Sequence, residues 1–342
     1  MEEKEDIKAL WPLFSLPQND ELLSCWMVRN AHNHKQKIYT FYRKYLNPTK
    51  SKIWVIDSDR SPREDLVNLM SKGTGLSKDE IIQTTLMSFD GKLFEAIHAY
   101  GNTKWILPVG HYHTQTTRNS LMYCPGCLST DETPFFRKTW RLSISFCCPD
   151  CKMYLRECCW NCGAAVNFIR TELGRKNEFN LNHLTYCHNC HEDLRSARGS
   201  ICIPEDIVLQ NSFKSLMSNG HSRTLNYSHL YFEALYQVCA VMLSNRPRAL
   251  NLQRHVANAT NVFYKPILDG RERSFDYIDS KRRRDVLTMA AWALEDWPHR
   301  FLNVMRNSRT GVFIPFLNRQ KSNLPFWYAS INYPSPFTIG PG

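Results

Sequence analysis

The cysteines of this 342-residue chain are crowded into one stretch, and ten of the thirteen lie within residues 124–190. Eight of them form four C-x-x-C pairs, which are Cys124 with Cys127, Cys148 with Cys151, Cys159 with Cys162 and Cys187 with Cys190. A C-x-x-C turn directs two thiolates at one point, and two such turns complete the four-sulfur shell that zinc prefers. The stretch is therefore predicted to fold around two structural zinc ions as tandem zinc ribbons.

The order of the pairs favours a sequential arrangement of the two sites. Twenty residues separate the first two pairs and 24 separate the last two, which is typical of zinc ribbons. Sequential pairing also closes shorter loops than a crossed pairing of the turns. Some alternatives stay open, because further cysteines and histidines flank the pairs and could replace a ligand: Cys147, Cys158, His183, His188 and His191.

Such sites are expected to stabilise the fold and to do no chemistry, because the protein fills all four coordination positions of each ion. Gly163 follows Cys162 directly and can take the positive φ that a tight cysteine turn requires. Disulfides are the alternative, but clustered cysteines of a cytoplasmic chain are metal ligands more often than disulfides. The acidic, polar N-terminus has no signal-peptide pattern, no apolar run is long enough to cross a membrane, and the chain is expected in the cytoplasm.

Positive charge is concentrated towards the C-terminus. The net charge of the chain is +11, and residues 203–342 hold 17 basic and 10 acidic side chains. Arginine is the better bidentate partner for phosphate or carboxylate, so this region is the expected contact with nucleic acid or a nucleoprotein partner. The candidate contact residues are Lys78, Arg271, Arg273, Arg282, Arg283 and Arg284. A plain solvated basic surface is the alternative.

The N-terminal part reads as helical. A first helix would carry Leu22, Leu23, Trp26 and Met27 on one face, with Asn19 or Asp20 as its cap. Two further helices are predicted around a glycine turn: one starts at a capping box on Ser61 and ends at Gly73, and the other starts at a capping box of Ser77 with Glu80. This outline fits a helix-turn-helix that presents Lys78, Gln83 and Thr84, or an ordinary αα-hairpin.

Helices are also predicted after the cysteine-rich stretch. Apolar residues recur at helical spacing in residues 229–243 and 284–297, and Pro298 ends the latter or begins another helix. Residues 53–56 and 139–146 suit short strands, whereas the tail from Ser322 holds too many prolines for a regular helix. We expect a mainly α protein with little β: a helix-turn-helix-like domain in residues 1–120, tandem zinc ribbons in 121–202 and a helical domain in 203–342.

The residues around the cysteines resemble the TniQ family of bacterial transposon target-selection proteins. The resemblance rests on the runs YCPGCL at Tyr123, FRKTWRL at Phe136, CPDC at Cys148 and CWNCG at Cys159. DELLSCW at Asp20, GLSKDE at Gly75 and LEDWP at Leu294 are similar to further family motifs. One departure is Cys151, where the family usually has histidine, and a thiolate there preserves a zinc shell.

The resemblance implies a non-catalytic adaptor. Proteins of this kind bring a target complex to a AAA+ ATPase regulator of transposition. One branch docks as a homodimer on an RNA-guided CRISPR effector such as Cascade, and the other, of the TnsD type, binds a DNA site directly. TnsD-type readers usually carry a long additional C-terminal region, so the length of this chain favours the adaptor branch. Without a nucleophile-elbow or metalloprotease motif in the sequence, an enzyme is the least supported class.

Overall fold

The computed structural model describes residues 10–46, 57–98, 101–112, 115–116, 118–170, 184–223, 225–266 and 274–307. The chain divides into two compact units, residues 1–90 with 96–210, and residues 91–95 with 211–342. Helices predominate and the strands are short, which confirms the predicted mainly α fold with little β. The three-domain division stays a prediction; its boundary at residue 120 lies within the first of these two units.

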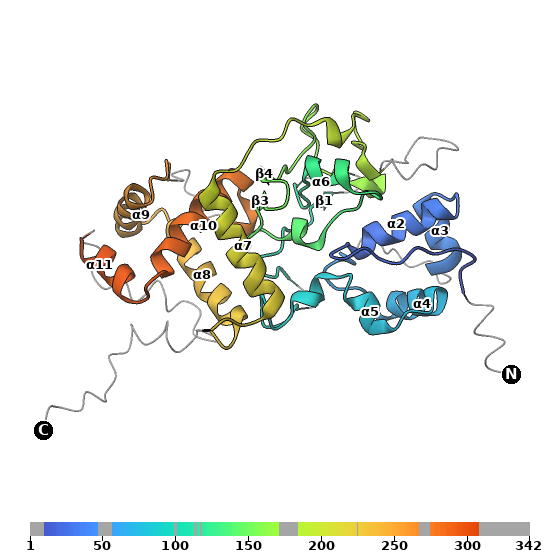
Figure 1. Ribbon diagram of the computed structural model, residues 1–342, viewed down its shortest axis with the longest axis horizontal. Coiled ribbons are helices and arrows are strands. Elements are labelled where there is room, and N and C mark those ends of the chain that lie inside the picture. Colours follow the sequence, from blue (N-terminus) through green and yellow to red (C-terminus); the bar gives the residue numbers. More distant parts are fainter. Residues whose placement is uncertain are drawn as a thin grey trace, which may run out of the picture. The chain divides into compact units, whose positions relative to one another are not determined.

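The first unit begins with helices that lie close together in Figure 1. They are α2 (Leu23–Asn33), α3 (Ile38–Phe41), the π-helical turn η1 (Tyr42–Leu46), α4 (Glu64–Thr74), α5 (Lys78–Ile82) and the 3-10 turn η3 (Leu86–Phe89). Their apolar faces are buried, and Trp26 and Met70 are completely enclosed. The predicted strand at residues 53–56 lies outside the described residues.

The N-terminus of α2 is capped from a distance. Neither Asn19 nor Asp20 caps this helix, contrary to the prediction. Asp20 has φ +66°, and its carboxylate accepts a hydrogen bond from Thr139 at 2.7 Å. The cap is Asp59, whose carboxylate accepts from the backbone N–H of Ser24 at 2.8 Å and from its hydroxyl at 2.7 Å. A residue 35 positions away thus satisfies a donor that the helix itself leaves unpaired.

The helix pair α4–α5 was predicted correctly at one of its two starts. Ser77 and Glu80 form the expected capping box. The capping box on Ser61 is wrong, because α4 begins at Glu64 after Arg63 and has no side-chain cap. The turn between the helices is built on Gly75, whose φ of +75° is the left-handed conformation that glycine adopts without strain.

Residues 139–146 do not form the predicted strand. The 3-10 turn η4 (Lys138–Arg141) occupies their start, and both the apolar and the polar residues of the segment are enclosed, as Ile144 and Ser143 illustrate. The segment contributes one isolated antiparallel bridge, between Leu142 and Ile106. The strand that follows it, β3 (Cys147–Cys148), pairs antiparallel with β4 (Met153–Tyr154). A second small pair joins β1 (His111–Tyr112) and β2 (Gln115–Thr116). The alternation of apolar and polar residues in 139–146 therefore does not mark a half-buried strand, because both kinds of side chain are buried.

Arg141 anchors that segment to the N-terminal helices. Its guanidinium lies 2.7 Å from the carboxylate of Asp57 and 3.5 Å from that of Asp59, and its side chain is 5% exposed. Since Asp59 also caps α2, one buried cation connects the chain between the first two cysteine pairs to the helical part. Burying the charged carboxyl of Asp59 is unfavourable. Burial raises the pKa of this group, although Arg141 opposes the shift.

The second unit is a helical cluster. Its elements are α8 (Ser228–Met242), α9 (Pro247–Ala259), the 3-10 turn η8 (Phe275–Tyr277), α10 (Ser280–Leu294) and α11 (His299–Asn307), and α7 (Pro204–Asn219) carries the chain into it. α8 and α10 correspond to the two helices predicted here, and α7 and α9 were missed. Cys25 in α2 and Cys239 in α8 are fully buried among apolar residues.

The proline-rich tail from Ser322 lies outside the described residues. Across the described ranges, none of the helices combines the length and the apolar character that crossing a membrane requires.

Candidate metal centres

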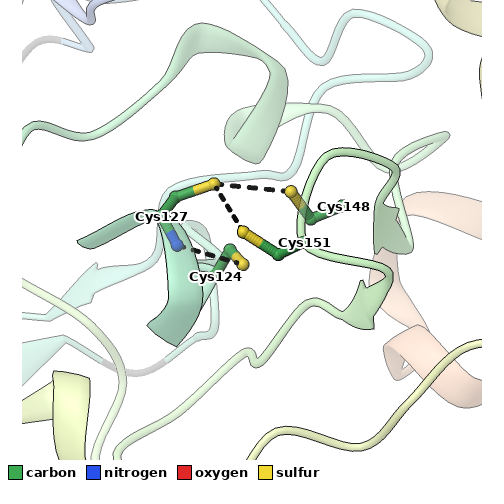
Figure 2. Close-up of side chains that lie close together, drawn as sticks. All are labelled: Cys124, Cys127, Cys148 and Cys151. Atoms are coloured by element: carbon green, nitrogen blue, oxygen red, sulfur yellow. Dashed lines mark hydrogen bonds between the residues drawn. The ribbon is translucent and has the colours of Figure 1, made fainter. Parts of the chain in front are cut away.

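The first cysteine cluster joins a helix to a hairpin. Cys124 and Cys127 lie at the start of α6 (Pro125–Thr130), where the sulfur of Cys124 accepts the backbone N–H of Cys127 at 3.5 Å. The β3–β4 hairpin brings Cys148 and Cys151 against them. As Figure 2 shows, the four side chains point at one another. The sulfur of Cys127 lies 3.4 Å from that of Cys148 and 3.5 Å from that of Cys151.

The second cluster is built in the same way from the other two pairs. The sulfurs of Cys159 and Cys190 are 3.6 Å apart, and those of Cys162 and Cys187 are 3.7 Å apart. Gly163 has φ +71°, as its place after Cys162 predicted. In each cluster all four sulfurs lie within 4.8 Å of one another. The arrangement is thus sequential, and the crossed pairing is wrong.

The sulfur spacing fits a tetrahedral metal shell. With metal–sulfur bonds of about 2.3 Å, the sulfurs of a zinc tetrathiolate lie about 3.8 Å apart, close to the 3.4–3.7 Å found between sulfurs here. Each cluster offers four sulfur donors, which suit a soft or borderline ion and leave no ligand position for substrate. The two clusters could therefore each hold one structural ion.

The thiols within each cluster shift one another's pKa, and a bound cation would offset the repulsion between their charged forms. Hydrogen bonds from Cys127 and Cys148 lower the pKa of Cys124 to about 4, whereas contact with Cys124 and Cys148 raises the pKa of Cys127. In the second cluster burial alone would raise the pKa of Cys162, but hydrogen bonds from Asn189 and from the backbone lower it to about 6. When these thiols lose their protons, the thiolates repel one another at this distance. A divalent ion bound between them would offset that repulsion.

Those alternative ligands that the structure describes lie outside both clusters. Cys147 turns away from its neighbour Cys148, and its sulfur lies 3.7 Å from the carbonyl oxygen of Asp206. Cys158 belongs to neither group of sulfurs, and His188 and His191 are not among the grouped ligand atoms of the described chain. Residue His183 lies outside the described residues.

Sequence reasoning missed the cation beside the first cluster. Arg137 binds the carboxylate of Asp131 through two hydrogen bonds of 2.8 and 3.0 Å. Its guanidinium also lies over the rings of Phe135 and Trp140, at 4.3 and 4.8 Å from their centres. Arg137 interacts electrostatically with Cys127, so its charge offsets that of the thiolates. No local motif indicates this role, because Asp131 and the two aromatic rings come together around Arg137 only in the folded chain.

Gly126, between the cysteines of the first pair, has no room for a side chain. A Cβ atom there would lie 2.8 Å from the sulfur of Cys151. We therefore expect Gly126→Ala to displace Cys151 and to reduce zinc bound at the first cluster, measured as metal content of the purified protein. Gly163→Ala is the matched control: a Cβ there meets nothing within 4 Å, so it should cost about 1 kcal/mol of backbone strain and keep both ions. Equal zinc content in Gly126→Ala and wild type would contradict this geometry.

The predicted contact residues do not share one environment. Lys78 is exposed on α5, but Thr84, predicted to face outward, is buried. Arg283 is 1% exposed, and its guanidinium donates to the carbonyl of Ile278 at 2.6 Å. That burial removes Arg283 from the candidate contacts.

The other arginines fall into two groups. Arg282 and Arg284 are half-buried, and Arg284 lies 3.4 Å from Asp285. Arg271 and Arg273 lie outside the described residues. The predicted Arg282–Arg284 cluster is thus reduced to two accessible side chains in the described part of the chain.

The comparison with known families agrees with the cysteine geometry. Residues 12–155 match the family model described as TniQ. The match starts before α2, contains the Arg141 network and the whole first cluster, and ends before the second cluster. A search of curated proteins found no match to this chain. Residues 12–155 thus resemble a TniQ domain, which supports membership of the TniQ family and indicates a transposition-associated protein.

Proposed function

We propose that this chain is a zinc-stabilised, non-catalytic adaptor that selects targets in transposition. The observation that carries the proposal is the TniQ match, whose residues 12–155 include the N-terminal helices and the first cysteine cluster. The eight cysteines of the two clusters are the proposed ligands of two zinc ions, which hold the segment rigid. Because these ligand shells are closed, the ions supply structure and no Lewis acid for a substrate.

The proposed partners are a AAA+ ATPase regulator of transposition and an RNA-guided effector complex of the Cascade type, with the adaptor acting as a homodimer. The α4–α5 pair supports docking to a protein over reading DNA. α5 is five residues long, and Asp79 and Glu80 lie exposed in its first turn beside Lys78. A recognition helix uses its N-terminal residues on base edges between phosphates, where carboxylates are repelled.

The alternative is a target selector of the TnsD type, which binds a specific DNA site directly and recruits the same regulator. The two functions predict different behaviour on naked DNA. A direct reader binds its attachment site tightly without any effector and loses affinity steeply as salt rises.

Co-purification with the AAA+ regulator and the RNA-guided effector encoded by the same transposon tests the adaptor function. We expect the chain to retain both proteins on an affinity column and to shift no specific DNA fragment at physiological salt. Binding of one fragment at nanomolar protein in the absence of effector, with no retention of the effector, would establish the direct reader instead. A variant with Cys124→Ser should lose both partners, since the docking helices share a unit with the first cluster.

A further inference from the structure

A long stretch of the second unit carries basic residues and no acidic ones. Between Glu233 and Asp269 the sequence holds four arginines and lysines and not one aspartate or glutamate. The stretch contains α9, where Arg254 is exposed, and the extended chain that follows it. Exposed cations without acidic neighbours in the sequence favour contact with a polyanion.

The extended chain after α9 alternates between outward and inward side chains. Asn261, Phe263 and Lys265 are exposed, whereas the residues between them are half-buried. This is the period of two that an extended backbone imposes. Tyr264 points inward and donates its hydroxyl proton to the carbonyl of Met242 at the end of α8. The inward anchor fixes Phe263 on the outer side, where it is 95% exposed.

Arg282 brings a second cation to the same segment. Its guanidinium donates to the carbonyl oxygen of Lys265 and lies 5.6 Å from the centre of the Tyr264 ring. Arg282 thus holds the backbone of the segment that displays Phe263, and the side chain of Lys265 is exposed two residues along it. A single exposed apolar residue is ordinary on protein surfaces. Phe263, by contrast, is almost fully exposed on an anchored backbone, with an exposed lysine two residues away and an arginine bound to the same segment.

We propose that Phe263, Lys265 and Arg282 form a binding site for unpaired nucleic acid. A base stacks on the Phe263 ring, and the two cations contact the adjoining phosphates. Every base has a π-face, so such a site tolerates any sequence. The inference deepens the proposed function and rests on it for its biological ligand, because an RNA-guided complex displaces an unpaired DNA strand at its target.

Stacking is tested by changing the ring alone. Affinity is measured by fluorescence anisotropy with labelled oligothymidine and oligouridine of about 20 nucleotides, a length that spans one such site. Phe263→Ala should weaken binding about tenfold, the usual effect of losing one base–aromatic stack. Phe263→Tyr should retain affinity, whereas Phe263→Leu should behave like the alanine variant because it keeps apolar area without a π-face. Tyr227→Ala, which removes a ring 61% exposed elsewhere in the unit, should bind like wild type.

The cations are tested by the salt dependence of the same binding. Each phosphate contact on a single strand contributes about 0.7 to the slope of log K against log salt. Lys265→Ala combined with Arg282→Gln should therefore reduce the slope by about 1.4, and glutamine keeps a donor for the Lys265 carbonyl. Phe263→Ala should leave the slope unchanged. Arg306→Ala, at an exposed arginine of α11, is the charge control and should have no effect.

Two results would overturn the site. One is wild-type affinity of Phe263→Ala for both oligonucleotides. The other is a duplex of equal length bound as tightly as the single strands by wild type and by Phe263→Ala, which would reduce the surface to duplex-backbone binding. Tighter binding of oligothymidine would identify DNA as the ligand, and tighter binding of oligouridine would identify RNA. If the chain retains neither the regulator nor the effector but binds the oligonucleotides as expected, the adaptor function is wrong. The proposed nucleic-acid site is then unaffected.

Discussion

Replacing Cys124 by serine is expected to reduce the bound zinc from two ions to about one and to unfold much of the first unit, because metal binding in such sites is folding free energy. In small zinc peptides each structural ion contributes on the order of 10 kcal/mol, a value comparable to the whole stability of a domain. Cys124 is the N-cap residue of α6 and accepts a backbone hydrogen bond there, so its loss also weakens the helix start.

Metal content by mass spectrometry and a thermal melt measure this effect. Cys187→Ser is the companion variant and should also lose one ion, this time from the second cluster. Cys158→Ser is the matched control, since Cys158 precedes a ligand directly but belongs to neither cluster, and it should keep two ions. Two zinc ions in Cys124→Ser, or one in Cys158→Ser, would show that the ligand sets are drawn wrongly.

The second large effect is expected from Arg141→Met. The substitution keeps an unbranched apolar stem but leaves the carboxylates of Asp57 and Asp59 without the cation that neutralises them. Removing one partner of a buried ion pair destabilises by about 3–5 kcal/mol. The triple variant with Asp57→Asn and Asp59→Asn should recover most of that loss, because no buried charge then remains unpaired. Chemical denaturation monitored by circular dichroism at neutral pH checks both, and a triple variant no more stable than Arg141→Met would refute the electrostatic origin.

The same network predicts a pH dependence. Burial raises the pKa of Asp59 above its value in the unfolded chain, so the folded state binds a proton more tightly than the unfolded state. For a group of this sign, stability is highest where the group is protonated and falls as pH rises through the folded pKa. Without Arg141 the shift should be larger, so the stability deficit of Arg141→Met should be smaller at pH 5 than at pH 8.

The cysteine clusters were predictable because C-x-x-C spacing is a local rule that carries its own geometry. The eight cysteines meet in the predicted groups of four. The capping box at Ser77 was predictable for the same reason, since Glu80 is three residues away. The cap on α2 was not, because its acceptor, Asp59, lies far along the chain while the nearby Asp20 is engaged with Thr139.

The other errors also arise from tertiary context. The alternation in residues 139–146 looks like a half-buried strand, but both faces of this segment are enclosed, so the period carried no information about extension. Arg283 lies among basic neighbours that are exposed or half-buried, yet it alone of this run is turned into the core. α7 and α9 begin at Pro204 and Pro247. Proline at a first helical turn was the signal that could have found them.

The remote cap on α2 also sets the order in which the first unit can form. As the chain leaves the ribosome, α2 emerges first, but the carboxylate that satisfies its N-terminal turn follows 35 residues later. The guanidinium that neutralises this carboxylate appears 82 residues later still, shortly before the second cysteine pair. Contacts of such long range form late and slowly. The N-terminal helices are therefore completed only after Arg141 has been synthesised.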